Sequence, residues 1–199
     1  MKKVIALFCT AFVLLSSGYA QSNRVGIYLT PQYCFFNQKG IFDKSVKGNG
    51  FIFNGGAYYE KNWGLYGVSV GVGYTQLNTL LKTDSIETKY NRGFVSIPIG
   101  GAYEFGITDN ISIGMHGTIG LSYLISEKQF DAGIEKTDME AGKKLYCSFG
   151  AGLSFTYLFN ESMGLSAKPI FSFMYVFDPI APLYLGVGAQ LQFFYAFGY

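Results

Sequence analysis

The sequence predicts an all-β protein, an eight-stranded antiparallel up-and-down β-barrel of the transmembrane kind. Three observations lead to this fold class. Bulky and small side chains alternate with a period of two, the connections between the alternating segments are short and long in turn, and charge is scarce. Hydrophobic residues make up 49% and charged residues 14% of the 199 residues, whereas an average soluble domain has about 25% charged residues.

The alternation is clearest between Trp63 and Thr75. Every second residue from Tyr66 to Tyr74 is bulky and apolar, and the residues between them are glycine or serine. Successive side chains of a strand point to opposite faces, so one face is bulky and the other is small. The same split predicts eight strands, at 24–36, 50–60, 63–76, 91–105, 110–125, 145–159, 163–175 and 184–199.

The predicted connections alternate in length. Short turns are expected at Lys61-Asn62, 106–109 and 160–162. Longer loops are expected at 37–49, 77–90 and 126–144, with an intermediate connection at 176–183. Charged residues concentrate in the longer loops, above all in the third. Short periplasmic turns at one end and long polar loops at the other are typical of membrane barrels.

An alternating eight-stranded sheet also fits a soluble barrel that encloses a ligand. The residue types on the two faces of the sheet decide between a soluble barrel and a membrane barrel. A soluble barrel needs charge on its outer face, whereas here the face opposite the bulky one carries mostly Gly, Ser, Thr and Gln. Small polar side chains suit the narrow interior of eight strands. The aromatic face would be a large apolar patch in water, which monomers rarely tolerate. The sequence therefore predicts that the aromatic residues face lipid.

The first 20 residues have the pattern of a secretory signal peptide. Lys2 and Lys3 precede an apolar stretch at 4–15, and small residues flank Tyr19 before a cleavage site after Ala20. The stretch of about 12 residues is shorter than the roughly 20 needed to span a bilayer. We therefore expect a signal peptide at 1–20 and one outer-membrane β-barrel domain at 21–199.

The predicted mature chain is electrically balanced. Removing Lys2 and Lys3 leaves 13 basic and 13 acidic residues, hence no formal net charge. Nucleic acid is excluded as a partner because binding phosphates needs a concentrated basic surface. Cys34 and Cys147 have no metal-site spacing; isolated thiols packed as small apolar groups are favoured, with a disulfide between them as the alternative. No cofactor is expected.

The chain end alternates bulky residues up to the last position, at Phe193, Tyr195, Phe197 and Tyr199. This end resembles the C-terminal signal by which the barrel-assembly machinery recognises bacterial outer-membrane barrels, and the mature chain resembles small eight-stranded members of that class. The segment 94–104, FVSIPIGGAYE, resembles a strand motif of the porin-like and PorT-like barrels of Bacteroidetes. The resemblance implies an exported monomer in the outer membrane, with the assembly machinery as a partner.

Motifs that carry chemistry are few. The segment Gly67–Gly71 matches G-x-S-x-G, but that motif needs a strand-to-helix turn and here lies mid-strand, which predicts small interior residues. His116 is the only histidine and falls on the predicted inner face, where a packed residue is favoured over a catalytic base. Glu104 and Lys168 fall on the same face, and charges inside a barrel usually pair. Glu104, His116 and Lys168 form the predicted lumen polar cluster, while Arg24, Glu60 and Arg92 are placed near strand ends.

These observations predict a non-enzymatic protein with a structural or surface-interaction role. Its loops at 37–49, 77–90 and 126–144 would meet an extracellular ligand or protein. A narrow porin or small-solute channel is the first alternative and needs a continuous water path past Glu104, His116 and Lys168. A membrane-embedded lipid-modifying enzyme is the second.

Overall fold

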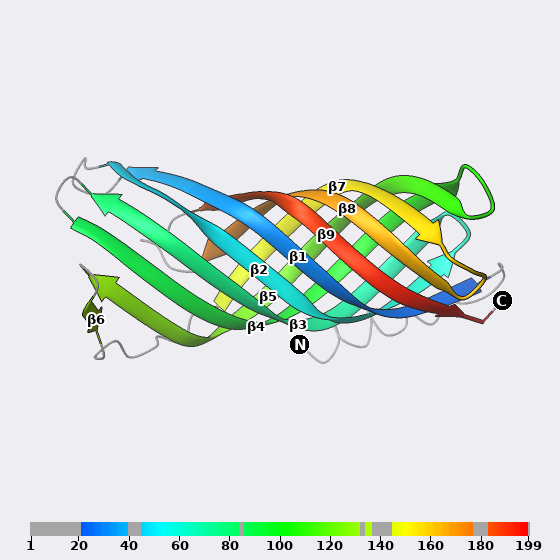
Figure 1. Cartoon of the computed structure of the whole chain (residues 1–199), viewed down its shortest axis with the longest axis horizontal. Helices are drawn as coiled ribbons and strands as arrows, with labels where there is room; N and C mark the ends of the chain where they lie inside the picture. The colour runs from blue at the N-terminus through cyan, green and yellow to red at the C-terminus, as the bar shows by residue number, and fades with distance from the viewer. Residues whose placement is uncertain are drawn as a thin grey trace, which may run out of the picture.

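The computed structural model describes residues 21–39, 45–83, 86–131, 134–136, 145–176 and 183–198. All nine strands belong to one antiparallel sheet (Figure 1). They are β1 (Gln21–Lys39), β2 (Ser45–Trp63), β3 (Tyr66–Thr83), β4 (Ile86–Gly106), β5 (Ile111–Asp131), β6 (Ile134–Lys136), β7 (Leu145–Leu158), β8 (Met163–Val176) and β9 (Tyr184–Phe197).

Eight of these strands close into a barrel, as the alternation predicts. Each barrel strand pairs with the next along the chain, and β1 pairs with β9 to complete the ring. The short β6 lies outside the ring and extends only β5, where Ile134–Lys136 pairs with Gln129–Asp131. Closure leaves no open sheet edge through the wall, so the backbone is hydrogen-bonded within the ring.

The wall has a bulky outer face and a small inner face. On β7, Leu153 and Phe155 are 52% and 48% exposed, whereas Ser154 between them is 1% exposed. The predicted assignment of faces is therefore confirmed along this strand. On β1 the outward apolar positions run from Val25 to Phe35, eleven residues along the strand. At about 3.3 Å per residue and a tilt of about 40°, they span about 25 Å along the barrel axis.

Aromatic side chains gather at both edges of this outward apolar band. Near the turns, the rings of Tyr66 and Tyr103 lie 5.2 Å apart and those of Tyr157 and Phe159 lie 5.5 Å apart. Further toward the other end, the rings of Phe171 and Phe173 lie 5.0 Å apart on β8. The exterior is thus one apolar belt with aromatic rims.

The short turns define one end of the barrel, called the turn end below. The predicted turn at Lys61-Asn62 was wrong by three residues, because β2 continues through Trp63 and the chain reverses at Gly64 and Leu65. Gly64 has a φ of 61°, a conformation that glycine adopts without a steric penalty. The turns at 107–110 and 159–162 lie close to the predicted positions.

Side-chain oxygens close these two turns. The Thr108 hydroxyl oxygen accepts from the backbone N–H of Ile111 at 3.1 Å. Asn160 Oδ1 accepts from the N–H groups of Ser162 and Met163 at 2.9 and 2.8 Å. Short polar side chains that bond their own backbone favour such turns, which explains why the sequence located them well.

The opposite end, called the loop end below, differs from the prediction. Most of the expected loops at 37–49 and 77–90 are strand, and β5 and β6 extend into 126–144. Strands β1 to β5 are therefore 18–21 residues long, against 14 for β7, β8 and β9. Figure 1 shows the hairpins β1–β2, β3–β4 and β5–β6 projecting beyond the other strands.

The reason for this difference is a reversal of the face pattern. On β3 the inward Leu77 and Thr79 are 0% and 2% exposed, whereas the outward Gln76 is exposed. The alternation continues in this segment, but the outward residues are polar. A prediction that requires bulky outward residues therefore places the end of the strand too early.

Residues 1–20 and Tyr199 lie outside the described residues, so the signal peptide stays a prediction. Within the described ranges, no helix is long and apolar enough to cross a membrane.

Candidate functional site

The inward positions of the described strands bring the predicted lumen residues into the barrel interior, which is organised in levels along the axis. A charged network lies near the turn end, small polar side chains fill the middle, and apolar side chains lie toward the loop end. Each level is built from inward positions of neighbouring strands, whose register brings distant parts of the chain together.

Arg24 is the centre of the charged network. Its Nη1 donates to Glu60 Oε1 at 3.0 Å and to Glu104 Oε2 at 3.1 Å, which joins β1, β2 and β4. The hydroxyl of Thr156 donates to Glu104 Oε1 at 3.3 Å. The guanidinium of Arg24 also lies 4.7 Å from the centre of the Phe194 ring. One guanidinium shared by two carboxylates leaves each of these charges with a partner.

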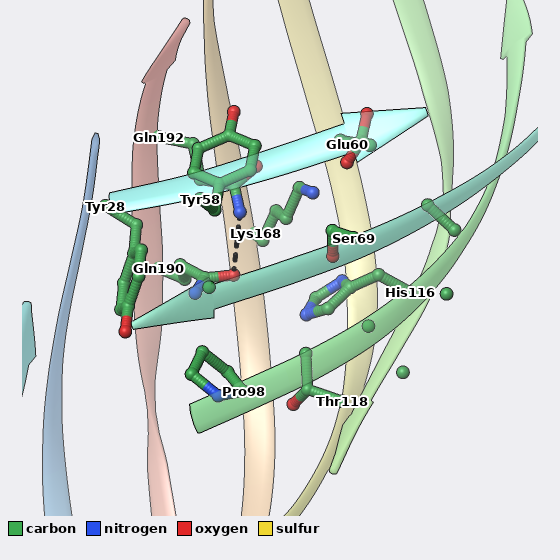
Figure 2. Close-up of a pocket in the computed structure, with 15 residues that line it drawn as sticks. Tyr28, Tyr58, Glu60, Ser69, Pro98, His116, Thr118, Lys168, Gln190 and Gln192 are labelled. Atoms are coloured by element: carbon green, nitrogen blue, oxygen red, sulfur yellow. Dashed lines mark hydrogen bonds between the residues drawn. The ribbon is translucent and has the colours of Figure 1, made fainter. Parts of the chain in front are cut away.

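The predicted cluster of Glu104, His116 and Lys168 is divided between two levels. All three side chains are on inward positions, and His116 and Lys168 are 6% and 3% exposed. His116 and Lys168 line the same cavity, in which Glu60 takes the place expected for Glu104 (Figure 2). Glu104 lies in the charged network, and the sequence prediction missed the roles of Arg24 and Glu60 there.

The middle level contains two adjacent cavities of about 30 and 60 Å³. Together they are called the polar chamber, because they share four lining residues, Tyr28, Pro98, Thr118 and Gln190. Figure 2 shows the side chains of Lys168, His116 and Gln190 converging on the smaller cavity.

Hydrogen bonds run across the wall of the polar chamber. The Ser96 hydroxyl lies 2.6 Å from the Thr75 hydroxyl and 2.9 Å from the Ser122 hydroxyl, which links β3, β4 and β5. The Ser172 hydroxyl donates to Gln32 Oε1 at 2.5 Å. These bonds satisfy part of the chamber wall, as buried polar groups require.

Other buried atoms in this region have no hydrogen-bond partner. Thr30 Oγ1 and both ring nitrogens of His116 are among them. Thr30 lines the larger cavity and His116 the smaller one. The unpartnered groups of these two residues therefore lie beside empty space.

The apolar level forms a complete layer that we call the septum. It consists of eight side chains, each at most 5% exposed and each from a different barrel strand. They are Cys34, Ile52, Leu77, Phe94, Leu124, Tyr146, Met174 and Tyr184. The rings of Phe94 and Tyr146 meet edge to face, with their centres 4.5 Å apart. The sequence prediction gave the inner face mostly small and polar residues, and although it placed Tyr146 on that face it missed this layer.

A second ion pair lies beside the septum at the loop end. Arg92 Nε donates to Glu127 Oε1 at 2.6 Å, and its Nη1 donates to the Tyr184 hydroxyl oxygen at 3.0 Å. The side chains of Arg92 and Glu127 are 13% and 3% exposed. The sequence placed Arg92 near a strand end but identified no partner for it.

Other chemistry suggested by single motifs has no site here. Ser69 of the G-x-S-x-G match lies within β3 and lines the smaller cavity, with no helix after it. Across the described ranges, no group of three or more His, Cys, Asp or Glu side chains is placed to hold a metal ion. Cys34 and Cys147 are free and buried, in agreement with the isolated-thiol interpretation.

The chain has no matching family model. It also matches no curated protein, so its resemblance to PorT-like barrels rests on the segment 94–104 alone. The fold class is nevertheless defined by the strand pairing: a closed eight-stranded antiparallel barrel.

Three solved bacterial proteins are similar to the chain over most of its length. Ail, the attachment invasion locus protein of Yersinia pestis, has 16% identity and a TM-score of 0.45, over 90% of this chain and 100% of Ail. Neisserial surface protein A has 14% identity and a TM-score of 0.43, over 83% and 95%. The outer membrane protein OprG of Pseudomonas aeruginosa has 13% identity and a TM-score of 0.36, over 92% and 99%.

Proposed function

We propose that the protein is an integral outer-membrane β-barrel that presents its three projecting hairpins at the cell surface as a binding platform. The observation that carries the proposal is the outward apolar belt with aromatic rims, about 25 Å tall on β1. Outer-membrane barrels have an apolar band of about this height between aromatic girdles.

The energetics of the exterior support a lipid environment. Outward side chains in the middle of the wall are large and half exposed, for example Val72 at 58% and Ile119 at 51%. A belt of this size would associate in water, whereas lipid removes that penalty. The closed ladder also satisfies the backbone without water, which a bilayer requires.

The projecting hairpins support a role at the surface. Beyond the belt the exterior is polar, with Glu87, Lys89 and Lys128 exposed on β4 and β5. Because this part is paired β-structure, it offers a preformed polar surface whose ordering cost is small when a ligand binds. Such a surface suits a polar partner, a protein or a glycan, and not an apolar one.

The remaining alternatives have less support. An open channel needs water along the whole axis, and the septum interrupts it. A lipid-modifying enzyme needs its base at the membrane rim, whereas His116 lies inside the barrel at a chamber-lining position.

Outer-membrane lipid and the barrel-assembly machinery are the partners that the proposal implies. Phe193, Tyr195 and Phe197 point outward for such recognition, at 42%, 50% and 40% exposure.

Labelling of single cysteines on intact cells tests the orientation. Lys128→Cys on a projecting hairpin should react with a membrane-impermeant maleimide on intact cells. Asp109→Cys in a turn, equally exposed, should react only after the outer membrane is permeabilised. The wild type is the blank, because Cys34 and Cys147 are buried. The opposite labelling pattern would overturn the proposed orientation, and labelling of neither would overturn membrane insertion.

Shortening a hairpin tests the binding role. Residues 79–90, the tip of hairpin β3–β4, are replaced by Asn-Gly, a favoured two-residue β-turn. Wild-type and shortened proteins in nanodiscs are then compared on arrays of glycans and extracellular-matrix proteins. We expect ligands retained by the wild type to be lost by the shortened protein. If neither form binds, or both bind equally, the hairpins are not the binding platform.

A further inference from the structure

The polar chamber has features of a water-filled space. By the scale of about 10–15 Å³ per buried water, its cavities of about 30 and 60 Å³ have room for about two to three and about four to six molecules. His116, with 6% exposure, has two unpartnered ring nitrogens, and Thr30 has an unpartnered hydroxyl. Leaving such groups without a partner costs about 1–3 kcal/mol each, and water in the adjoining cavities removes this cost.

The polar surroundings favour water over other small ligands. Glu60 and Lys168 line the smaller cavity together with amide and hydroxyl groups, so donors and acceptors are both present. The carboxylates of Glu60 and Glu104 carry two negative charges, and Arg24 and Lys168 carry two positive charges, so the charges of this region balance. An added ion would bring an unbalanced charge into a low-dielectric interior, which is costly.

The two ends of the chamber are closed to different degrees. Toward the loop end, the septum has a buried side chain from every barrel strand. Ile52 and Met174 belong to the septum and also line the larger cavity, so the septum is the boundary of the chamber. Six of its eight side chains are apolar, and the hydroxyl of Tyr184 already accepts a hydrogen bond from Arg92, so the layer offers water few hydrogen-bond partners. Narrow apolar constrictions exclude water from pores.

The turn end has no such complete layer in the described part of the chain. Its buried apolar cluster consists of Tyr28, Tyr58, Phe194 and Ala196, which come from β1, β2 and β9, and the partly buried Leu158 of β7 packs against it. The rest of the cross-section holds the charged network, where the side chains of Arg24 and Glu104 are 15% and 12% exposed. Water can therefore reach the chamber wall through polar groups at this end.

We infer that the lumen is a water-filled vestibule that is wetted from the turn end and closed by the septum, which acts as an apolar gate. Water then fills the lumen from the turn end up to the septum, and the septum alone blocks the movement of water and protons across the barrel. Opening that layer alone converts the barrel into a path for protons. This inference is independent of the proposed binding role, because it concerns the interior and not the projecting hairpins.

Proton flux into liposomes tests the gate. The protein is refolded into liposomes that contain a pH-sensitive dye, and a pH step is applied outside. The wild type should leak no faster than protein-free liposomes. Removing the two rings that meet in the septum, in Phe94→Ala/Tyr146→Ala, should raise the flux by about tenfold or more, because a water chain then crosses the dewetted layer.

A matched lumen variant separates gating from general loosening. Tyr58→Ala removes an aromatic ring from the incomplete turn-end cluster, and we expect wild-type flux because the septum remains. A second septum variant, Leu124→Ala, should raise the flux less than the double variant. Folding of each variant is established by heat-modifiable electrophoretic mobility. The inference is wrong if a folded septum variant leaks no faster than the wild type, or if the wild type leaks as fast as the double variant. It is also wrong if Tyr58→Ala leaks as fast as the double variant.

Discussion

At the level of single residues, Arg24 is shared between the buried carboxylate of Glu60 and the largely buried carboxylate of Glu104. Its bonds to Glu60 and Glu104, at 3.0 and 3.1 Å, link three strands at the turn end. Removing one partner of a buried ion pair is costly because the remaining charge stays in a poorly solvating interior. The stability of this end therefore depends on one guanidinium more than on either carboxylate.

Arg24→Ala should destabilise the folded barrel by about 3–5 kcal/mol, since the buried carboxylate of Glu60 and the largely buried one of Glu104 lose their partner. Urea unfolding in detergent micelles or liposomes measures the change in the free energy of unfolding. The control is Lys89→Ala at an exposed position, where we expect a change within about 0.5 kcal/mol. Equal effects of the two substitutions would contradict the role given to Arg24.

Single residues also mark the limit of prediction from the sequence. The alternation placed Glu104, His116 and Lys168 on inward positions, because the face of a residue follows from its parity along the strand. It did not identify Arg24 as the partner of Glu104, because a pair 80 residues apart depends on the register of several strands. That register is set by pairing around the closed ring and cannot be read from one segment.

The septum had a signal in the sequence that the alternation concealed. Near the loop end several strands carry consecutive large apolar residues, as in Tyr123-Leu124-Ile125 and Phe173-Met174-Tyr175. Such runs break a pattern of bulky outside and small inside. Their middle residues, Leu124 and Met174, are septum residues. A run of this kind at one end of each strand can therefore indicate an apolar layer across a barrel.

At the level of elements, strand centres were predictable and strand ends were not. The centres alternate between lipid-type and interior-type residues, which gives a clear period of two. Past the belt, outward residues become polar and inward ones apolar, as at Gln76 and Leu77. The period of two persists, but the polar residues now lie on the outer face and the apolar residues on the inner face. Judged by composition alone, these segments therefore resemble polar loops.

Pairing of adjacent strands limits which glycines can be replaced. On β5 an added Cβ at Gly114 would overlap the backbone carbonyl oxygen of Tyr103, whereas at Gly101 on β4 the nearest atom would be 4.0 Å away. Gly114→Ala should therefore destabilise the barrel by about 1–3 kcal/mol through overpacking. Gly101→Ala should change stability by less than about 0.5 kcal/mol.

Equilibrium unfolding of the two variants measures this difference. Both positions lie in the wall and both substitutions add one methyl group, so hydrophobicity and size are matched. If Gly101→Ala destabilises the barrel as much as Gly114→Ala, close approach of neighbouring strands is not what restricts Gly114.

At the level of the whole molecule, the belt predicts how the cost of a charge depends on depth. Ile119 lies on the outward face of β5 in the middle of the belt, with 51% exposure, and Ser126 is exposed on the projecting part of the same strand. Ile119→Arg should cost about 2–4 kcal/mol in a bilayer, and Ser126→Arg about 0–1 kcal/mol.

Folding titrations into liposomes measure both free energies. As a control, folding of the same two variants is also measured in buffer without lipid. We expect neither variant to form a folded barrel there. Equal costs at the two depths, or folding in plain buffer, would contradict a membrane-spanning belt.

The seam between β1 and β9 has a consequence for the timing of biogenesis. It pairs Asn23 with Phe197, positions that are 174 residues apart, so almost the entire polypeptide must be synthesised before the ring can close. Joining such distant segments carries the largest loop-closure entropy of any neighbouring pair in the wall. Until then the first strand has an unsatisfied edge that can pair with a foreign strand. We therefore expect the edge of the first strand to need protection from other chains for as long as the last strand is missing.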